Sequence, residues 1–208
     1  MLLSAVEPHG GNREALARRL DCRPDQLLDA SASLVPFGPP QWLRSHLGRA
    51  LHGDALTAYP DREHWALRQA IARCHGLYPE QVLPGNGAAE LFTWLARDAS
   101  AVGINVLPAP GFADYRRALL TWDARCCTQL LPLQWCADSP QPWPERSLHN
   151  DGVLWLTNPH NPTGQLWSRS SLEPLLRRFE LVVVDEAFLP LLPGGERQSL
   201  VPCLDHYS

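Results

Sequence analysis

The sequence predicts an α/β fold in which helices cover both faces of a mostly parallel sheet. Short apolar segments that end in turn residues alternate with amphipathic segments through the second half of the chain. This alternation is typical of parallel sheets, because each connection between parallel strands needs a crossover, usually a helix. The chain has 208 residues, of which 45% are hydrophobic and 19% charged, so its composition is globular.

Three helices are expected before the sheet begins. They cover about residues 13–20, 42–51 and 63–75, and an irregular, proline-rich stretch separates the first two. The third helix has an apolar face, because its apolar residues follow the spacing i, i+3, i+4, i+7. These residues are Leu67, Ala70, Ile71 and Cys74.

The sheet is expected to contain five short strands joined by helices. The expected strands are residues 81–84, 104–107, 128–133, 153–157 and 181–185. The expected helices are residues 88–97, 112–122 and 168–179, with Ser168 as the cap of the last, and residues 134–151 form a loop. Ligands of parallel sheets gather at the carboxyl ends of the strands, so any chemistry is expected there.

Composition and charge exclude several classes of function. The 18 basic and 22 acidic residues give a net charge of -4 without a basic stripe, which argues against a nucleic-acid partner. No segment reaches the ~18–20 uncharged apolar residues of a membrane span. The six cysteines form no CxxC pair and no metal-binding spacing, which indicates buried thiols in a reducing cytoplasm. All basic residues are arginine, so chemistry through a lysine amine is excluded.

Three expected strand ends carry residues that suit a ligand. Gly85-Asn-Gly opens a helix whose first N–H groups can face an anion, although an ordinary strand-to-helix turn would look the same. Asn158-Pro-His-Asn-Pro-Thr-Gly aims the Asn161 amide either above the sheet or at its own backbone. Asp185 ends a buried strand and needs a donor or cation, unless it caps the next helix. Together they suit a ligand with a phosphate and a protonated ring nitrogen.

Seven short motifs in one order carry a resemblance to a known family. They are His9-Gly-Gly-Asn, Asp29-Ala-Ser-Ala-Ser-Leu-Val-Pro-Phe-Gly-Pro-Pro, Tyr59-Pro-Asp, Leu83-Pro-Gly-Asn-Gly-Ala-Ala-Glu, Pro110-Gly-Phe-Ala-Asp-Tyr, Asn158-Pro-His-Asn-Pro-Thr-Gly and Asp185-Glu-Ala-Phe. The sequence resembles the aspartate-aminotransferase-like (fold type I) pyridoxal-phosphate enzymes. Within them it is most similar to the threonine-phosphate decarboxylases of cobalamin synthesis and to the histidinol-phosphate aminotransferases.

The resemblance implies a cofactor, pyridoxal 5'-phosphate, and a three-layer α/β/α large domain. It implies that Asp185 pairs with the pyridinium nitrogen, that Asn161 hydrogen-bonds the phenolic oxygen, and that Phe112 stacks on the ring. The remaining cofactor contacts that it implies are to the phosphate: the N–H groups of Gly87, Ala88 and Ala89, and Tyr59 toward the neighbouring subunit's cofactor.

The substrate implied by the resemblance is a phosphorylated amino acid. His9 and Gly10 would cover the substrate phosphate, and Asn161 would also contact the substrate. Ser33 is also implied to contact the substrate, although the decarboxylases have an asparagine at this position. Phe188 favours the decarboxylases, because the aminotransferases commonly have a tyrosine there. The leading interpretation is a threonine-phosphate decarboxylase-like enzyme. The alternatives are an aminotransferase of the histidinol-phosphate type and a non-catalytic binding or dimerising module.

The family's Schiff-base lysine lies beyond the last residue, so the chain contains no catalytic residue of that kind and is expected to be inactive alone. The resemblance implies the N-terminal part of a homodimeric enzyme. Residues 1–50 would belong to the small domain and substrate lid, and residues 51–208 to the truncated large domain. The strands expected beside residues 81–84 would also lie beyond the end, which leaves that strand without a neighbour.

Overall fold

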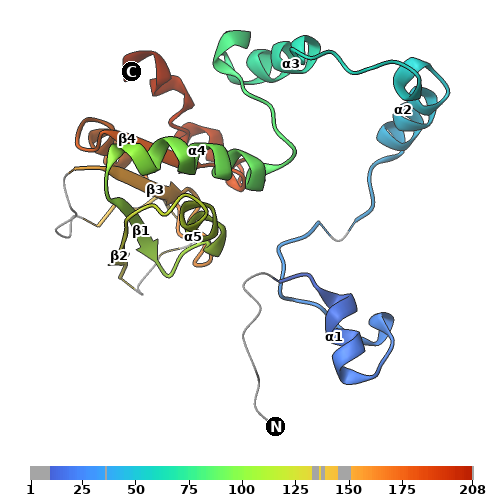
Figure 1. Cartoon of the computed structure of the whole chain (residues 1–208), viewed down its shortest axis with the longest axis horizontal. Coiled ribbons are helices and arrows are strands. Elements are labelled where there is room, and N and C mark those ends of the chain that lie inside the picture. Colours follow the sequence, from blue (N-terminus) through green and yellow to red (C-terminus); the bar gives the residue numbers. More distant parts are fainter. Residues whose placement is uncertain (1–9, 36, 133–135, 137–138, 145–150, 208) are drawn as a thin grey trace. The chain divides into compact units, whose positions relative to one another are not determined.

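The computed structural model describes residues 10–35, 37–132, 136, 139–144 and 151–207. The chain divides into two compact units, Met1–His64 and Trp65–Ser208 (Figure 1). No described helix is long and apolar enough to cross a membrane.

The described residues of the first unit form two helices, α1 (Arg13–Leu20) and α2 (Gln41–Leu51), and two 3-10 turns, Pro24–Gln26 and Asp54–Leu56. Asn12 begins α1, because its Oδ1 accepts a hydrogen bond from the Ala15 N–H at 3.3 Å. Both helices lie where the sequence predicts them.

The second unit is built on a four-stranded parallel sheet with the order β2-β1-β3-β4. Its strands are β1 (Asn105–Ala109), β2 (Cys126–Leu130), β3 (Val153–Thr157) and β4 (Leu181–Asp185). Its helices are α3 (Trp65–His75), α4 (Ala88–Val102), α5 (Ala113–Leu120) and α6 (Arg169–Leu172). Short 3-10 turns cover Pro79–Gln81, Glu173–Arg177, Leu189–Leu191, Gly195–Gln198 and Val201–His206.

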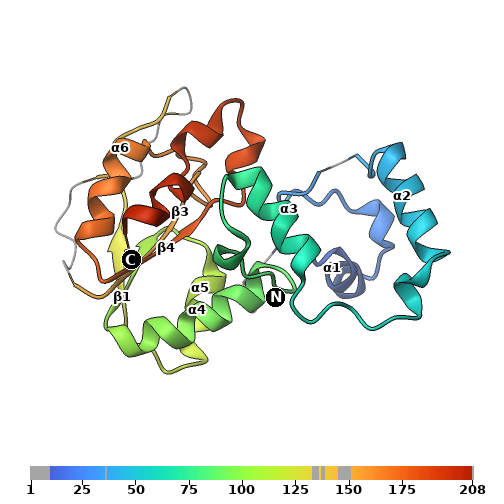
Figure 2. The ribbon, with the colours of Figure 1, turned by 90° about the horizontal axis from the view of Figure 1, so that it is seen from above.

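Helices cover both faces of this sheet, as the sequence predicts. Successive residues of a strand point to opposite faces. Val153 and Trp155 of β3 therefore pack with α4 and α5, while Leu154 and Leu156 pack with α6 and the turns that follow it. Figure 2 shows the ribbons of α4, α5 and α6 around the strands. All five residues of β3 are buried, which explains its continuous apolar sequence.

The strand order reverses between β1 and β3. From β1 the chain passes through α5 to β2 on one side, and from β3 it passes through α6 to β4 on the other. The β1–β2 and β3–β4 pairings each run through five residues, but the β1–β3 pairing comprises only Asn105↔Val153 and Val106↔Leu154. The pairing between β1 and β3 thus stops well before the carboxyl ends of these strands. Open α/β sheets bind ligands at such a reversal point, outside the carboxyl ends of the strands.

The prediction of a strand at residues 81–84 is wrong. A 3-10 turn ends at Gln81, the Val82 N–H bonds back to the Pro79 carbonyl, and residues 82–85 form no regular element. A strand exists only where a neighbour supplies hydrogen bonds, and none of the four strands of the sheet pairs with this segment.

Several other boundaries differ from the prediction, and three of them by the most residues. The strand expected at residues 128–133 is Cys126–Leu130, and the helix from Ala88 continues to Val102. The helix expected through residue 179 changes after Leu172 into a 3-10 helix, because Pro174 has no N–H for the α-helical ladder. Ser168 does begin α6, but its backbone carbonyl, not its side chain, accepts the first hydrogen bonds.

Candidate functional site

The candidate site lies at the carboxyl edge of the sheet in the second unit. Because all four strands are parallel, the segments after β1, β3 and β4 emerge at this same edge. Phe112 and Asn161 lie in the segments after β1 and β3, and Asp185 is the last residue of β4. The structure thus places these three predicted site residues, which are far apart in the sequence, at one edge of one sheet.

Two hydrogen bonds orient the Asp185 carboxylate. The Tyr115 hydroxyl of α5 donates to Oδ2 at 2.8 Å, and the Ala187 N–H donates to Oδ1 at 2.9 Å. Because the Tyr115 proton is directed to Asp185, the Thr157 hydroxyl at 2.7 Å donates to the Tyr115 oxygen. The result is a chain of hydrogen bonds from β3 through α5 to the end of β4. Asp185 is half-buried.

Tyr115 is the buried centre of this chain, with 4% of its surface exposed. Its ring has edge or tilted contacts with Phe92, Phe112 and Trp155 at centroid distances of 5.0, 5.4 and 5.5 Å. Burial, followed by the nearby Asp185 charge, raises the pKa of Tyr115 well above its ordinary value of 10.0. The phenol therefore stays protonated and remains a donor.

This pKa shift predicts a loss of stability in alkali. Unfolded chains lose the Tyr115 proton above pH 10, while the folded protein keeps it. The contribution of Tyr115 to the free energy of unfolding is therefore fully present below pH 10 and declines above it. The free energy of unfolding should fall by about 1.4 kcal/mol more per pH unit in the parent than in Tyr115→Phe. Urea unfolding between pH 9 and about pH 11 measures the difference. Tyr78→Phe, at a 70% exposed site, is the control; if both variants change the slope equally, the phenol is not responsible.

Phe112 begins α5 directly after the β1 loop. Its half-buried ring meets Phe92 of α4 edge-on at 6.4 Å and Tyr115 at 5.4 Å. The preceding Gly111 cannot carry a side chain, because a Cβ there would lie 2.2 Å from the Pro108 carbonyl oxygen. The aromatic ring is therefore held by α4, α5 and a tight turn.

The predicted phosphate cradle is the first turn of α4. Gly87 precedes this helix with φ +84°, and no atom lies within 4 Å of the position that its Cβ would take. Ala88 and Ala89 are exposed, and first-turn N–H groups have no acceptor inside their helix. The adjoining loop is closed by Glu90, whose Oε2 accepts from the Asn86 N–H at 2.6 Å.

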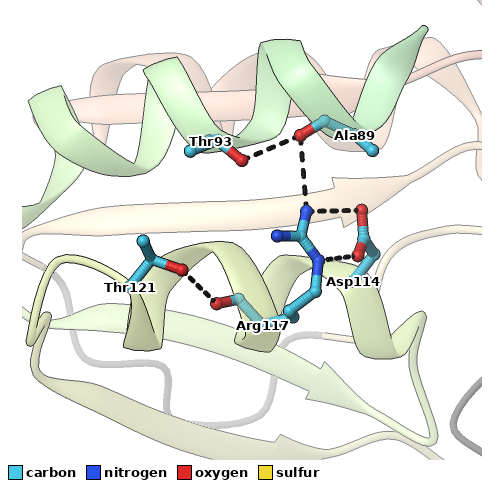
Figure 3. Close-up of polar contacts among 5 residues, drawn as sticks. All are labelled: Ala89, Thr93, Asp114, Arg117 and Thr121. Atoms are coloured by element: carbon cyan, nitrogen blue, oxygen red, sulfur yellow. Dashed lines mark hydrogen bonds and ion pairs between the residues drawn. The ribbon is translucent and has the colours of Figure 1, made fainter.

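Arg117 of α5 holds this first turn in place (Figure 3). Its guanidinium contacts both carboxylate oxygens of Asp114 and donates to the Ala89 carbonyl at 3.3 Å. The Asp114 carboxylate raises the pKa of Arg117 further. The Ala89 carbonyl also accepts from the Thr93 hydroxyl at 2.9 Å. Arg117 thus connects α5 to the first turn of α4, which is the end of α4 that would face a phosphate.

Asn161 lies in a loop whose two ends, Asn158 and Trp167, are joined by two hydrogen bonds. The Asn158 side chain accepts from the Trp167 N–H at 2.8 Å and donates to the Trp167 carbonyl at 3.1 Å. None of the hydrogen bonds found among the described residues uses the Asn161 side chain, which is half-buried. Among the described residues, the Asn161 side chain therefore makes no hydrogen bond to its own backbone.

The other predicted site residues belong to the first unit. Ser33 is exposed, and Tyr59 is fully exposed. Gly10 is exposed and lies so close to Ser31 that a Cβ would overlap the Ser31 carbonyl, and it lines a cavity of about 570 Å³ with Arg13 and Arg19. His9 lies outside the described residues.

Sequence reasoning missed Tyr115, Thr157, His160 and Arg117 as parts of the site. Tyr115 and Phe112 are three residues apart, which places them on neighbouring positions of one helical turn, but nothing local points Tyr115 at Asp185. Among the described residues no group of three or more His, Cys, Asp or Glu side chains could hold a metal ion.

Comparisons with known proteins agree on one family. The sequence model of the family "Aminotransferase class I and II" matches residues 27–207. The threonine-phosphate decarboxylase of Salmonella typhimurium is 32% identical over 195 residues, which cover 89% of this chain and 51% of that protein. The histidinol-phosphate aminotransferase of Stutzerimonas stutzeri is 30% identical over 191 residues, which cover 90% of this chain and 51% of that protein.

Solved structures share the fold. The histidinol-phosphate aminotransferase from Sinorhizobium meliloti, in complex with pyridoxal-5'-phosphate, superposes with a TM-score of 0.65 at 20% identity, over 93% of this chain and 51% of that one. The expected α/β fold is thereby confirmed. The chain spans about half the length of the curated relatives it matches. It belongs to the aminotransferase class I and II family.

Proposed function

We propose that this chain is the N-terminal, pyridoxal-phosphate-binding part of a threonine-phosphate decarboxylase-like enzyme. The observation that carries the proposal is the Asp185 carboxylate, held by Tyr115 and Ala187 at the carboxyl edge of the sheet. A carboxylate fixed in this way suits a protonated ring nitrogen. The similarity to the Salmonella decarboxylase supports the choice of enzyme.

The residues at this edge fit the cofactor. Asp185 offers an anion to the pyridinium, Phe112 offers a flat apolar face, and Asn161 offers an amide without an internal partner among the described contacts. The first turn of α4 at Gly87, Ala88 and Ala89 offers N–H groups and the positive end of the helix dipole to a phosphate. When bound, pyridoxal phosphate supplies an electron-poor ring that accepts the electron pair of a breaking bond at an amino acid's α-carbon.

Each residue then has a defined task. Asp185 would keep the proton on the ring nitrogen of the bound cofactor, and Tyr115 orients Asp185 by donating to its Oδ2. Asn161 would donate to the phenolic oxygen of the bound cofactor, and Phe112 would cover a face of the ring and exclude water from it. The chain contains no lysine, so the covalent attachment of the cofactor is assigned to another part of the whole enzyme.

The proposal for the first unit concerns substrate and assembly. His9, Gly10 and Ser33 would bind a phosphorylated amino acid, and the Arg13 and Arg19 side chains at the cavity beside Gly10 provide charge of the right sign. Tyr59, which is fully exposed, would reach the neighbouring subunit's cofactor in a homodimer.

Residues 1–50 would belong to the small domain and substrate lid and residues 51–208 to the large domain. The six free cysteines support a cytoplasmic location.

The second candidate is an aminotransferase of the histidinol-phosphate type. The similarity to the Stutzerimonas aminotransferase favours it, and it would use the same cofactor contacts. Phe188, half-buried at the start of a 3-10 turn after β4, favours the decarboxylase, because it offers no hydroxyl to the phenolic oxygen.

Joining this chain to the second half of the Salmonella decarboxylase, which would supply the lysine, tests the proposal. We expect carbon dioxide from O-phosphothreonine and no keto product, and equilibrium dialysis should show that the 208-residue chain alone binds pyridoxamine phosphate. Consumption of a keto acceptor with histidinol phosphate would establish the aminotransferase instead. A chain that binds no pyridoxamine phosphate would be a non-catalytic module.

A further inference from the structure

His160 connects the segments that follow β1 and β3, the two strands between which the sheet reverses. Its side chain is 3% exposed, and its Nε2 lies 2.6 Å from the Pro110 carbonyl oxygen. Backbone pairing between β1 and β3 ends at Val106↔Leu154, three residues before the end of each strand. The imidazole therefore joins the two segments at the edge where the sheet ladder no longer does.

The contact with the Pro110 carbonyl indicates which nitrogen of the imidazole carries a proton. A carbonyl oxygen only accepts, so Nε2 carries a proton, and in the neutral ring Nδ1 carries none. Nδ1 is buried without a hydrogen-bond partner among the described residues. Burial lowers the pKa of His160, which keeps the ring neutral at neutral pH. A charged ring would need a second acceptor for the proton on Nδ1, and none is found among the described residues.

The His160 backbone fixes the loop that holds Asn161. Its N–H donates to the Gln165 carbonyl and its carbonyl accepts from the Gly164 N–H, both at 2.7 Å, so residues 161–164 form a closed turn. The ring itself lies 6.3 Å from the Trp167 ring, whose backbone is paired with Asn158. His160 therefore belongs to this turn through its backbone and to the β1 segment through its imidazole, so a hydrogen bond of the imidazole ties the turn to that segment.

Pro110 stands two residues before Phe112, and Gly111 between them tolerates no side chain. One hydrogen bond thus joins the residue directly before Asn161 to the turn directly before Phe112. These are the two residues assigned to the phenolic oxygen and to the face of the cofactor ring. A change in the His160–Pro110 distance would move one contact relative to the other.

We propose that His160 is a positioning residue, which sets the distance between Asn161 and Phe112 and so shapes the cofactor site at the reversal point of the sheet. This inference rests on the proposed function, because it gives the hydrogen bond a purpose only if a ring binds between these residues. In this role His160 would contact neither the substrate nor the cofactor and would act through Asn161 and Phe112.

Two amide substitutions that differ by one methylene test the proposal on the 208-residue chain. In His160→Gln the amide reaches the Pro110 carbonyl, whereas in His160→Asn it stops short. The probe is pyridoxamine phosphate, which needs no lysine. We expect His160→Asn to weaken its binding about tenfold, as for one lost buried hydrogen bond, and to reduce the circular dichroism that the bound ring acquires. His160→Gln should restore both.

Gln165→Leu is the matched control. Gln165 is a buried polar residue of the same loop, but its side chain bonds Cys136 and Leu166, not the β1 segment. Its loss should lower the melting temperature and leave the affinity for pyridoxamine phosphate unchanged. If His160→Asn does not fold, His160→Leu is compared with His160→Gln in the same way.

The outcomes separate this inference from the proposed function. A parent chain that binds no pyridoxamine phosphate refutes the proposed function. A parent that binds, together with equal affinities for His160→Asn and His160→Gln, refutes the positioning role. An affinity loss in Gln165→Leu as large as that in His160→Asn also refutes it, because the effect would then come from the stability of the loop.

Discussion

Asp185→Asn is expected to weaken the binding of pyridoxamine phosphate by roughly ten- to hundredfold. A hydrogen bond to a charged partner contributes about 1.5–3 kcal/mol, and the neutral amide cannot match the charge of the carboxylate opposite a pyridinium. Equilibrium dialysis on the 208-residue chain measures the effect. The fold should remain, because the new amide would still accept a hydrogen bond through its oxygen, and circular dichroism checks this.

The neighbouring carboxylate provides the control for this experiment. Glu186 accepts from the Ser199 hydroxyl at 2.6 Å and from the Leu200 N–H at 2.7 Å, so its role is to hold the segment that follows β4. Glu186→Gln should therefore lower stability without changing the affinity. Equal affinities for Asp185→Asn and the parent would remove Asp185 from the proposed role.

Elements that depend on local pattern could be predicted from the sequence. The helices α1 and α2 and the strands β3 and β4 lie within a residue of their expected bounds, because apolar period and turn residues specify them locally. The segment 82–85 could not be predicted in this way. Its apolar residues suit a strand, but a strand also requires a partner from elsewhere, and the sheet supplies none.

The site shows the same division between local and distant information. The positions of Phe112, Asn161 and Asp185 at one edge follow from strand ends in a parallel sheet, which the sequence indicates. The contact from Tyr115 to Asp185 spans 70 residues, and the contact from His160 to Pro110 spans 50. No period or spacing encodes such contacts, because they depend on how α5 and the β3 loop pack.

Trp155→Ala is expected to cause the largest loss of stability. Trp155 is 0% exposed at the middle of β3, and its ring contacts Tyr115 and Phe92. Removing so large a buried side chain costs about 3–5 kcal/mol, a large part of the ~5–15 kcal/mol that stabilises a typical domain. Urea unfolding gives the difference in the free energy of unfolding.

A hydrogen bond adds to this loss and connects it to the site. The Trp155 Nε1–H donates to Asn105 Oδ1 at 2.8 Å, and Asn105 is fully buried, so alanine leaves that oxygen without its donor. The cavity would also lie beside Tyr115, which holds Asp185, so affinity for pyridoxamine phosphate should fall together with stability. Trp94→Ala, at a 36% exposed position on α4, is the control and should cost far less. Equal losses for the two variants would mean that β3 is not the centre of the core.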